Sequence, residues 1–205
     1  MAASSSAFAA GPSATLQVQG SVTQGACVPT LANGGVFNIG DKKVDELPSN
    51  YTRNVPIRLS IVCSAPTTLT YYIIDNRSDS SDGTTGHGGL GKTSTGINIG
   101  VWRHSEGFVG GSSNGTDNDL VAVYQKLSGE WVFGDKPGAG KDSWFTDMST
   151  VKSFAHASSS SYDPQPIMEA VVDVYPWWKI DKSNLNGISD VENIDGNATF
   201  VFNYL

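Results

Sequence analysis

Apolar and polar residues alternate with a period of two in several stretches of the chain, the spacing of a β-strand that buries one face. In residues 55–63 every odd position is apolar, while Pro56, Arg58 and Ser60 take the other face. The pattern predicts a half-buried strand whose Cys63 side chain points inward. Comparable alternation predicts strands at residues 69–75, 97–101, 120–126 and 168–174.

Three long polar stretches separate these strands, at residues 77–96, 104–119 and 134–166. They are rich in Gly, Ser and Asp, which is typical of surface loops. Because they exceed the usual length of a connection, they are either functional additions or contain short elements that the pattern does not reveal. No amphipathic helix is long enough to cover the strands. We therefore expect an all-β chain in which two sheets pack face to face.

The composition agrees with one all-β domain and narrows the choice of partners. The chain has 205 residues, among them 23 Gly and 9 Pro, and a net charge of −7. Because Lys and Arg do not gather into a basic patch, we expect no nucleic-acid partner. The sequence has no run of 18 or more apolar residues, so we expect no membrane insertion. Its first residues lack the features of a secretory signal, and we expect the numbering to begin at a mature or engineered N-terminus.

The two cysteines, Cys27 and Cys63, leave two readings open. Their spacing fits neither a CxxC redox pair nor a zinc site, which needs four clustered ligands. A single disulfide would stabilise the fold by roughly 3 to 4 kcal/mol in an oxidising compartment. Two buried free thiols in a cytosolic protein are the alternative.

Both ends of the chain carry alternating segments. The last eight residues, ATFVFNYL, place Phe200, Phe202 and Tyr204 on one face. Near the N-terminus, Gln17 and Gln19 oppose a face that stays apolar or small throughout. The members of that face are Phe8, Ala10, Pro12, Ala14, Leu16 and Val18. Taken alone, this segment could be the first strand of the chain's own sandwich.

The sequence resembles the subunits of chaperone-usher fimbriae. The matching features are ATLQVQGSVTQGAC at residues 14–27, a second cysteine within an alternating strand, and a closing ATFVFNYL with tyrosine next to last. In that family the subunit is an immunoglobulin-like β-sandwich that lacks its final strand, which leaves a hydrophobic groove. A periplasmic chaperone fills the groove first, and the N-terminal extension of the next subunit replaces it at the outer-membrane usher. The middle of the chain matches only in its β character.

The resemblance implies a donor-strand extension at residues 1–20 and an incomplete immunoglobulin-like domain at residues 21–205. It implies that a disulfide joins Cys27 and Cys63. The side chains expected to enter a neighbour's groove are Phe8, Ala10, Ala14, Leu16 and Val18. Those expected to border the groove and meet the chaperone are Phe200, Phe202 and Tyr204.

The same resemblance implies a non-enzymatic structural subunit without metal or cofactor, which supports adhesion or biofilm formation. Its partners would be identical or related subunits, the chaperone and the usher, and its location a cell-surface fimbrium reached through the periplasm. A shaft or other internal position is favoured, because a tip adhesin needs no donor strand. One departure is that many of these subunits have a glycine about fourteen residues from the C-terminus, where this chain has residues 191–193, VEN.

Several motifs suggest chemistry but lack its context. Residues 86–93, GHGGLGKT, match a phosphate loop, yet the strand before it and the helix after it are missing. Residues 181–192 approximate a calcium loop, with a leucine where a ligand belongs. The three histidines, His87, His104 and His156, fall in separate predicted loops and are interpreted as surface residues.

Two other functions remain as alternatives. Trp177 and Trp178 could form the aromatic platform of a secreted carbohydrate-binding β-sandwich, although packing in the core or at a subunit contact is the simpler interpretation. In that case the N-terminal strand would pair within its own chain. A hydrolase on a β-sandwich would need converging carboxylates, which the sequence does not locate.

Overall fold

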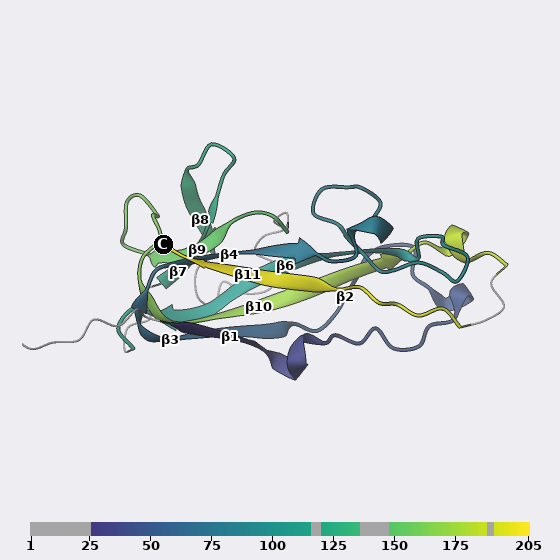
Figure 1. Ribbon diagram of the computed structural model, residues 1–205, viewed down its shortest axis with the longest axis horizontal. Helices are drawn as coiled ribbons and strands as arrows, with labels where there is room; N and C mark the ends of the chain where they lie inside the picture. The colour runs from purple at the N-terminus through teal and green to yellow at the C-terminus, as the bar shows by residue number, and fades with distance from the viewer. Residues whose placement is uncertain (1–25, 116–119, 136–147, 188–190) are drawn as a thin grey trace, which may run out of the picture.

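The computed structural model describes residues 26–115, 120–135, 148–187 and 191–205. It confirms the all-β prediction, because these residues form two antiparallel sheets whose strands share one core, consistent with a β-sandwich (Figure 1). Helical structure in the described ranges is limited to short 3-10 turns. These turns are η1 (Ala32–Gly35), η2 (Val44–Glu46), η3 (Ser78–Ser80) and η4 (Lys182–Leu185). No described helix has the length and apolar character that crossing a membrane requires.

The first sheet has the strand order β1-β3-β10-β6-β5, and β2 also pairs with β10. Its strands are β1 (Cys27–Leu31), β2 (Thr52–Arg53), β3 (Ile57–Thr67), β5 (Gly88–Gly89), β6 (Gly100–Ser112) and β10 (Ile167–Ile180). The second sheet has the order β11-β4-β9-β7-β8. Its strands are β4 (Leu69–Asp75), β7 (Leu120–Gln125), β8 (Trp131–Asp135), β9 (Lys152–His156) and β11 (Ala198–Tyr204). The first strand of the described chain, β1, is therefore an edge of the first sheet, and the last strand, β11, is an edge of the second sheet.

The predicted alternation decides which side chains form the core between the sheets. In β3 the odd residues from Ile57 to Cys63 are buried, and Arg58 and Val62 are exposed on the other face. In β10 the even residues from Ala170 to Ile180 are buried in the same way. The strands predicted at residues 69–75 and 120–126 are β4 and β7.

The expected loop at residues 104–119 is wrong, because β6 continues to Ser112. The inward positions of this strand include His104 and Glu106, and its outward positions include Ser105 and Gly107. Polar or small residues on both faces remove the alternation that would have marked a strand. His104 is therefore a buried residue rather than a surface histidine, with a relative exposure of 1%.

The expected loop at residues 134–166 is also too long. It contains β9, a five-residue strand in the middle of the second sheet, and His156 is the last residue of that strand. The β9 sequence KSFAH does not alternate because Lys152 and Phe154 both face the core. Residues 77–96 are mainly irregular, as predicted, apart from η3 and the short β5.

The disulfide between Cys27 and Cys63 is present. The two residues are direct partners in the antiparallel pairing of β1 with β3. The reading with two free thiols is wrong, since the described residues contain no free cysteine. The bond attaches β1, which is the edge strand of the first sheet, to the interior of the sandwich.

A cluster of ionisable side chains, which we call the buried ion cluster, joins the two sheets. Glu106 of β6 lies 3.1 Å from His104 Nε2 and 3.3 Å from Lys152 Nζ of β9, and it accepts a 2.7 Å hydrogen bond from the Tyr71 hydroxyl of β4. All four side chains are at most 1% exposed. Burial alone would raise the pKa of Glu106, but the charge of Lys152 and the hydrogen bonds from His104 and Tyr71 lower it to about 2.

The stability of the fold depends on Lys152, the cation of the buried ion cluster. We expect Lys152→Met to lower the free energy of unfolding by about 3 to 5 kcal/mol, because Glu106 is then left buried without its ammonium partner. The matched control is Lys126→Met, whose exposed partner Glu130 lies 3.0 Å away. It should cost less than about 1 kcal/mol. Urea denaturation measures both, and equal losses would contradict this role of the cluster.

The same cluster predicts a pH dependence. The folded-state pKa of Glu106 is lowered from 4.5 to about 2, so its contribution to stability is complete above pH 4.5 and is lost as the pH falls from 4.5 toward 2. Glu106→Gln should remove this part of the acid limb from a plot of unfolding free energy against pH. An unchanged acid limb in Glu106→Gln would show that other carboxylates cause it.

The disulfide should account for a large share of the stability. The cysteines are separated by 36 positions, so replacing both by serine should lower the free energy of unfolding by about 3 to 4 kcal/mol. Denaturant unfolding of the oxidised chain and of the Cys27→Ser/Cys63→Ser variant measures the difference. Two reactive thiols in the unreduced, denatured chain would contradict the bond itself.

Candidate functional site

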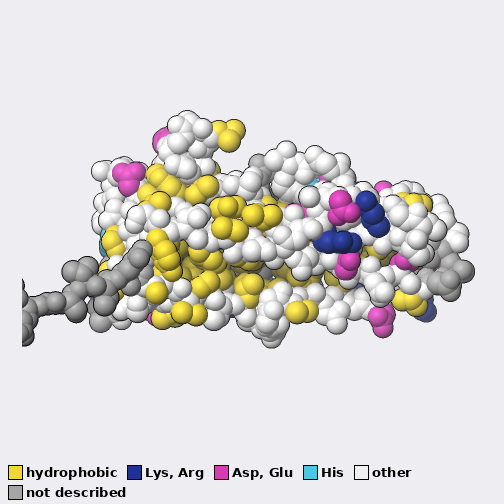
Figure 2. Space-filling model, in the orientation of Figure 1, with side chains coloured by type: hydrophobic (Ala, Val, Ile, Leu, Met, Phe, Trp, Pro, Cys, Tyr) yellow, Lys and Arg dark blue, Asp and Glu magenta, His cyan; other side chains and the backbone are white. Residues whose placement is uncertain are grey.

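An apolar groove of about 1280 Å³ runs along the side of the sandwich where β1 and β11 form the edges of the two sheets. Figure 2 shows hydrophobic side chains gathered along this side, over the region where Figure 1 draws β11 above β1. The walls are the residues that follow β1, from Gly34 to Val44, and those that precede β11, from Val191 to Ala198. The groove is thus a gap between the sheet edges rather than a hollow within one sheet.

The floor of the groove consists of inward-facing side chains of β3, β4, β6 and β10 together with neighbouring loops. Several of these belong to a second core cluster, separate from the one around Phe108 and Phe154. The groove residues in that cluster are Leu47, Ile73, Leu90, Ile99, Trp102, Ile180 and Leu185. An occupant of the groove would therefore pack directly against the core.

The strands beside the groove have open edges. Within the described residues β11 pairs with β4 alone, and β1 pairs with β3 alone. Unpaired backbone N–H and C=O groups along a sheet edge are a template for another strand. An apolar groove lined by such an edge can bind an extended peptide, through the backbone ladder and through pockets for alternate side chains.

The three C-terminal residues singled out by sequence occupy different positions relative to the groove. Phe200 lines it. Phe202 packs on the main core, and its ring stacks on Tyr71 with centroids 5.6 Å apart. The Tyr204 hydroxyl accepts a 3.0 Å hydrogen bond from the Cys27 N–H and so joins β11 to β1 at one end of the groove. The five expected donor residues lie outside the described part of the chain.

Sequence reasoning missed most of the groove lining. The wall at residues 34–44 is irregular and carries no strand pattern. Floor residues such as Leu90 and Leu185 come from a loop and from the short turn η4, where a single leucine gives no sign of its neighbours. The only available signal was the inward alternation of the strands, which identifies core residues but not which of them remain uncovered.

In the segment that matches a phosphate loop, backbone amides donate hydrogen bonds to side chains of the same chain. The Gly89 N–H donates to Asp75 Oδ2 and the Gly91 N–H to Ser80 Oγ, both at 3.0 Å. Lys92 is paired with Asp79 at 3.2 Å. Amides that a phosphate would need are thus satisfied within the chain, in agreement with the interpretation of this motif as structural.

The first part of the segment that approximates a calcium loop forms the 3-10 turn η4. Asp181 caps the turn, accepting hydrogen bonds from the Ser183 N–H at 3.0 Å and the Ser183 hydroxyl at 2.7 Å. These two bonds lower the pKa of Asp181. Leu185 is buried. Across the described ranges no group of three or more His, Cys, Asp or Glu side chains could hold a metal ion.

Adjacent tryptophans of β10 lie on opposite faces of the first sheet. Trp178 is 3% exposed and belongs to the second core cluster. Trp177 is half-buried, and its indole N–H donates to Ser105 Oγ at 3.1 Å. The guanidinium groups of Arg53 and Arg103 lie 5.7 and 5.9 Å from the centre of the Trp177 ring. The two indoles therefore cannot form one platform for a sugar.

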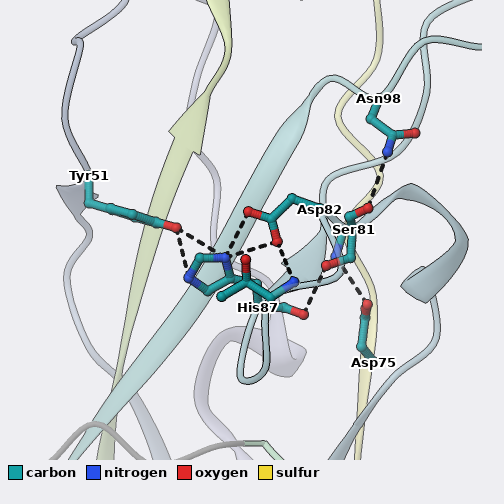
Figure 3. A network of polar contacts seen from close by, with 8 residues as sticks. Tyr51, Asp75, Ser81, Asp82, His87 and Asn98 are labelled. Carbon is teal, nitrogen blue, oxygen red and sulfur yellow. Dashed lines mark hydrogen bonds and ion pairs between the residues drawn. The ribbon is translucent and has the colours of Figure 1, made fainter.

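A polar network on the first-sheet side ties Tyr51 to the loop before β5 (Figure 3). The Tyr51 hydroxyl lies 3.0 Å from His87 Nε2, and His87 Nδ1 lies 3.0 Å from Asp82 Oδ2. Burial raises the pKa of Tyr51. Burial also favours a higher pKa for Asp82, but the Thr84 amide and His87 outweigh it and lower that pKa. None of these residues lines the groove, and we assign the network a structural role.

Comparison with known proteins gives one partial match. Residues 16–88 match the model of a family described as a protein of unknown function, DUF1120. The matched stretch contains both cysteines and ends at β5. No curated protein matches the chain. The match covers less than half of the chain and assigns these residues no activity.

The tryptophan pair gives a direct test of the interpretation as core packing. We expect Trp178→Ala to lower the free energy of unfolding by about 3 to 5 kcal/mol, because it opens a cavity beside the groove floor. Trp177→Ala is the matched control and should cost clearly less, since its ring is half-buried on the outer face. Urea denaturation measures both. A larger loss for Trp177→Ala would contradict this assignment.

Proposed function

We propose that the chain is a structural subunit of a chaperone-usher fimbria whose groove receives the N-terminal segment of the next subunit. The observation that carries the proposal is that no described strand pairs with the free edge of β11. In an immunoglobulin-like sandwich the last strand fills this position. In such a sandwich one sheet has the order A-B-E-D and the other contains C, F and G. Taken in chain order, β1, β3, β4, β6, β10 and β11 correspond to strands A to F.

The two sheet orders support this correspondence. The order β1-β3-β10-β6 corresponds to A-B-E-D, and the pair β11-β4 corresponds to F-C. Strand G would lie on the free side of β11, where the groove is found. Within the described residues no strand pairs with this free side of β11.

The N-terminal segment has the chemistry to fill this place. Residues 1–25 contain no Asp, Glu, Lys or Arg, although the chain as a whole has 33 such residues. Phe8, Leu16 and Val18 recur on the face that is apolar or small. Burial of each large side chain stabilises by about 1.5 to 3 kcal/mol, so with the smaller alanines the gross gain approaches ten kcal/mol. That is sufficient for a lasting contact between subunits.

Strand direction favours a segment from another copy over the chain's own. Cys27 at the start of β1 contacts Tyr204 at the end of β11, and the opposite ends, Leu31 and Ala198, line the same groove, so the two strands run in opposite directions. A segment folded back from Cys27 along β1 would run parallel to β11. A segment from a second copy is free to run antiparallel, which is slightly more stable per residue. We therefore propose that the groove is filled by a segment from a second copy of the chain.

The remaining parts of the proposal follow from this groove. Before assembly the groove would need a periplasmic chaperone to cover it, and an outer-membrane usher would exchange the chaperone for the next subunit. The product is a cell-surface filament that supports adhesion or biofilm formation, without catalysis or cofactor. No observation favours the carbohydrate-binding alternative, since Trp177 and Trp178 do not share a face.

Two complementary variants test the proposal. Deletion of residues 1–19 should leave a subunit that accepts a donor strand but supplies none. Phe200→Asp should leave one that supplies a strand but accepts none, because it places a charge in the apolar groove. Each variant alone should fail to polymerise, and their mixture should stop at a heterodimer that resists detergent at room temperature and separates on boiling. Electrophoresis with and without boiling measures this.

The control for Phe200→Asp is Asn203→Asp, an exposed position of the same strand. It should polymerise like the unchanged chain. Thermal unfolding should confirm that the deletion variant, Phe200→Asp and Asn203→Asp are all folded. Detergent-resistant polymers formed by the deletion variant alone would contradict the proposed role of the N-terminal segment.

A further inference from the structure

The hydrogen-bonding capacity of the two groove edges is unequal. From this asymmetry we infer that the strand that fills the groove pairs its backbone with β11 alone and leaves the edge of β1 unpaired. This inference rests on the proposed function and adds how the subunit holds its partner. Tyr204 and Pro29 are the residues that make the addition one-sided.

The free edge of β11 is available over its length. The Leu205 N–H donates to Thr68 O at 3.0 Å, and Asn197 O accepts from the Asn76 N–H at 2.9 Å. Backbone direction alternates along a strand, so odd residues of β11 face β4 and even residues face the groove. Four residues within the strand, the last of them Tyr204, therefore direct both an N–H and a C=O toward the groove, and the first three lie clear of the contact between Tyr204 and Cys27. These first three residues are Ala198, Phe200 and Phe202.

The free edge of β1 keeps outward carbonyls but has few N–H donors to offer. The Ser64 N–H donates to Ala26 O at 2.9 Å, so Cys27, Pro29 and Leu31 face away from β3. The Cys27 N–H already donates to the Tyr204 hydroxyl at 3.0 Å, and that hydroxyl lies 3.4 Å from Cys27 O. Pro29 has no N–H to offer. Leu31 alone keeps a free amide, at the last position of the strand.

The chain beyond Leu31 does not extend this edge. It turns through η1, where Asn33 has a φ of 54° and Gly34 a φ of 62°. The wall that follows presents apolar side chains such as Val36 and Ile39 to the groove and does not continue the strand. The incoming strand would thus form backbone hydrogen bonds with β11 and would contact only side chains on the β1 side of the groove.

This arrangement gives Tyr204 a positioning role. Its hydroxyl closes the end of the groove at Cys27, so a strand added to β11 ends its pairing near Phe202. The added strand then extends the second sheet and does not join the two sheets into one barrel. Side chains of the strand determine the fit against Leu31 and the loop wall.

Amide hydrogen exchange tests the inference. The sample is the full chain with Leu16→Asp, which weakens its own donor segment, and the probe is a synthetic peptide of residues 5–20. Exchange measured by NMR should slow by more than about tenfold at Phe200 and Phe202 when the peptide binds, because these amides gain partners. The Leu31 amide should change less than about twofold.

The outcomes separate this inference from the proposed function. No binding of the peptide, and no protection at any of the three amides, would overturn the proposed function. Binding with protection at Leu31 equal to that at Phe200, or with none at Phe200 and Phe202, would overturn one-sided pairing and leave the proposed function intact.

Tyr204→Phe provides the second readout and preserves the ring. The Cys27 amide should exchange more than about tenfold faster in this variant, while protection at Phe200 and Phe202 on peptide binding remains. An unchanged exchange rate at Cys27 would contradict the closure of the β1 edge by the tyrosine hydroxyl.

Discussion

The open edge of β11 beside an apolar groove is the constraint on which the rest of the structure depends. Buried backbone groups need hydrogen-bond partners, and a floor of core side chains needs cover, so a sandwich with this edge exposed is incomplete in both respects. The disulfide and the Tyr204 hydroxyl hold β1 on one side of the gap and close it at one end only. The strand that we propose comes from another molecule would meet both needs with one contact.

The buried ion cluster lies outside this gap and serves a different purpose. Glu106 and Lys152 come from strands of different sheets and meet without solvent. Such a pair is costly to bury, and its geometry fixes how β6 and β9 face each other. We interpret it as the contact that holds the two sheets together away from the groove, so that the chain can remain folded while the groove is uncovered.

The sequence predicted the strands in which apolar and polar residues alternate. It did not predict those in which polar or charged residues occupy inward positions. β3, β4, β7 and the first half of β10 follow from their apolar period, and the disulfide from the resemblance. β6 was hidden because His104 and Glu106 occupy inward positions that a simple core would fill with apolar residues. The groove could be expected from the two ends of the chain, but its floor depends on Leu90, Trp102 and other residues that only the fold brings together.

Disulfide trapping tests most directly whether the groove of one molecule is filled by another. A chain carrying Leu16→Cys in the N-terminal segment and Ala198→Cys in the groove wall would be assembled, oxidised and separated on a denaturing gel. The account predicts a ladder of covalent dimers and higher multimers that collapses to monomer on reduction. A monomer whose two new cysteines are joined within the same chain would contradict it.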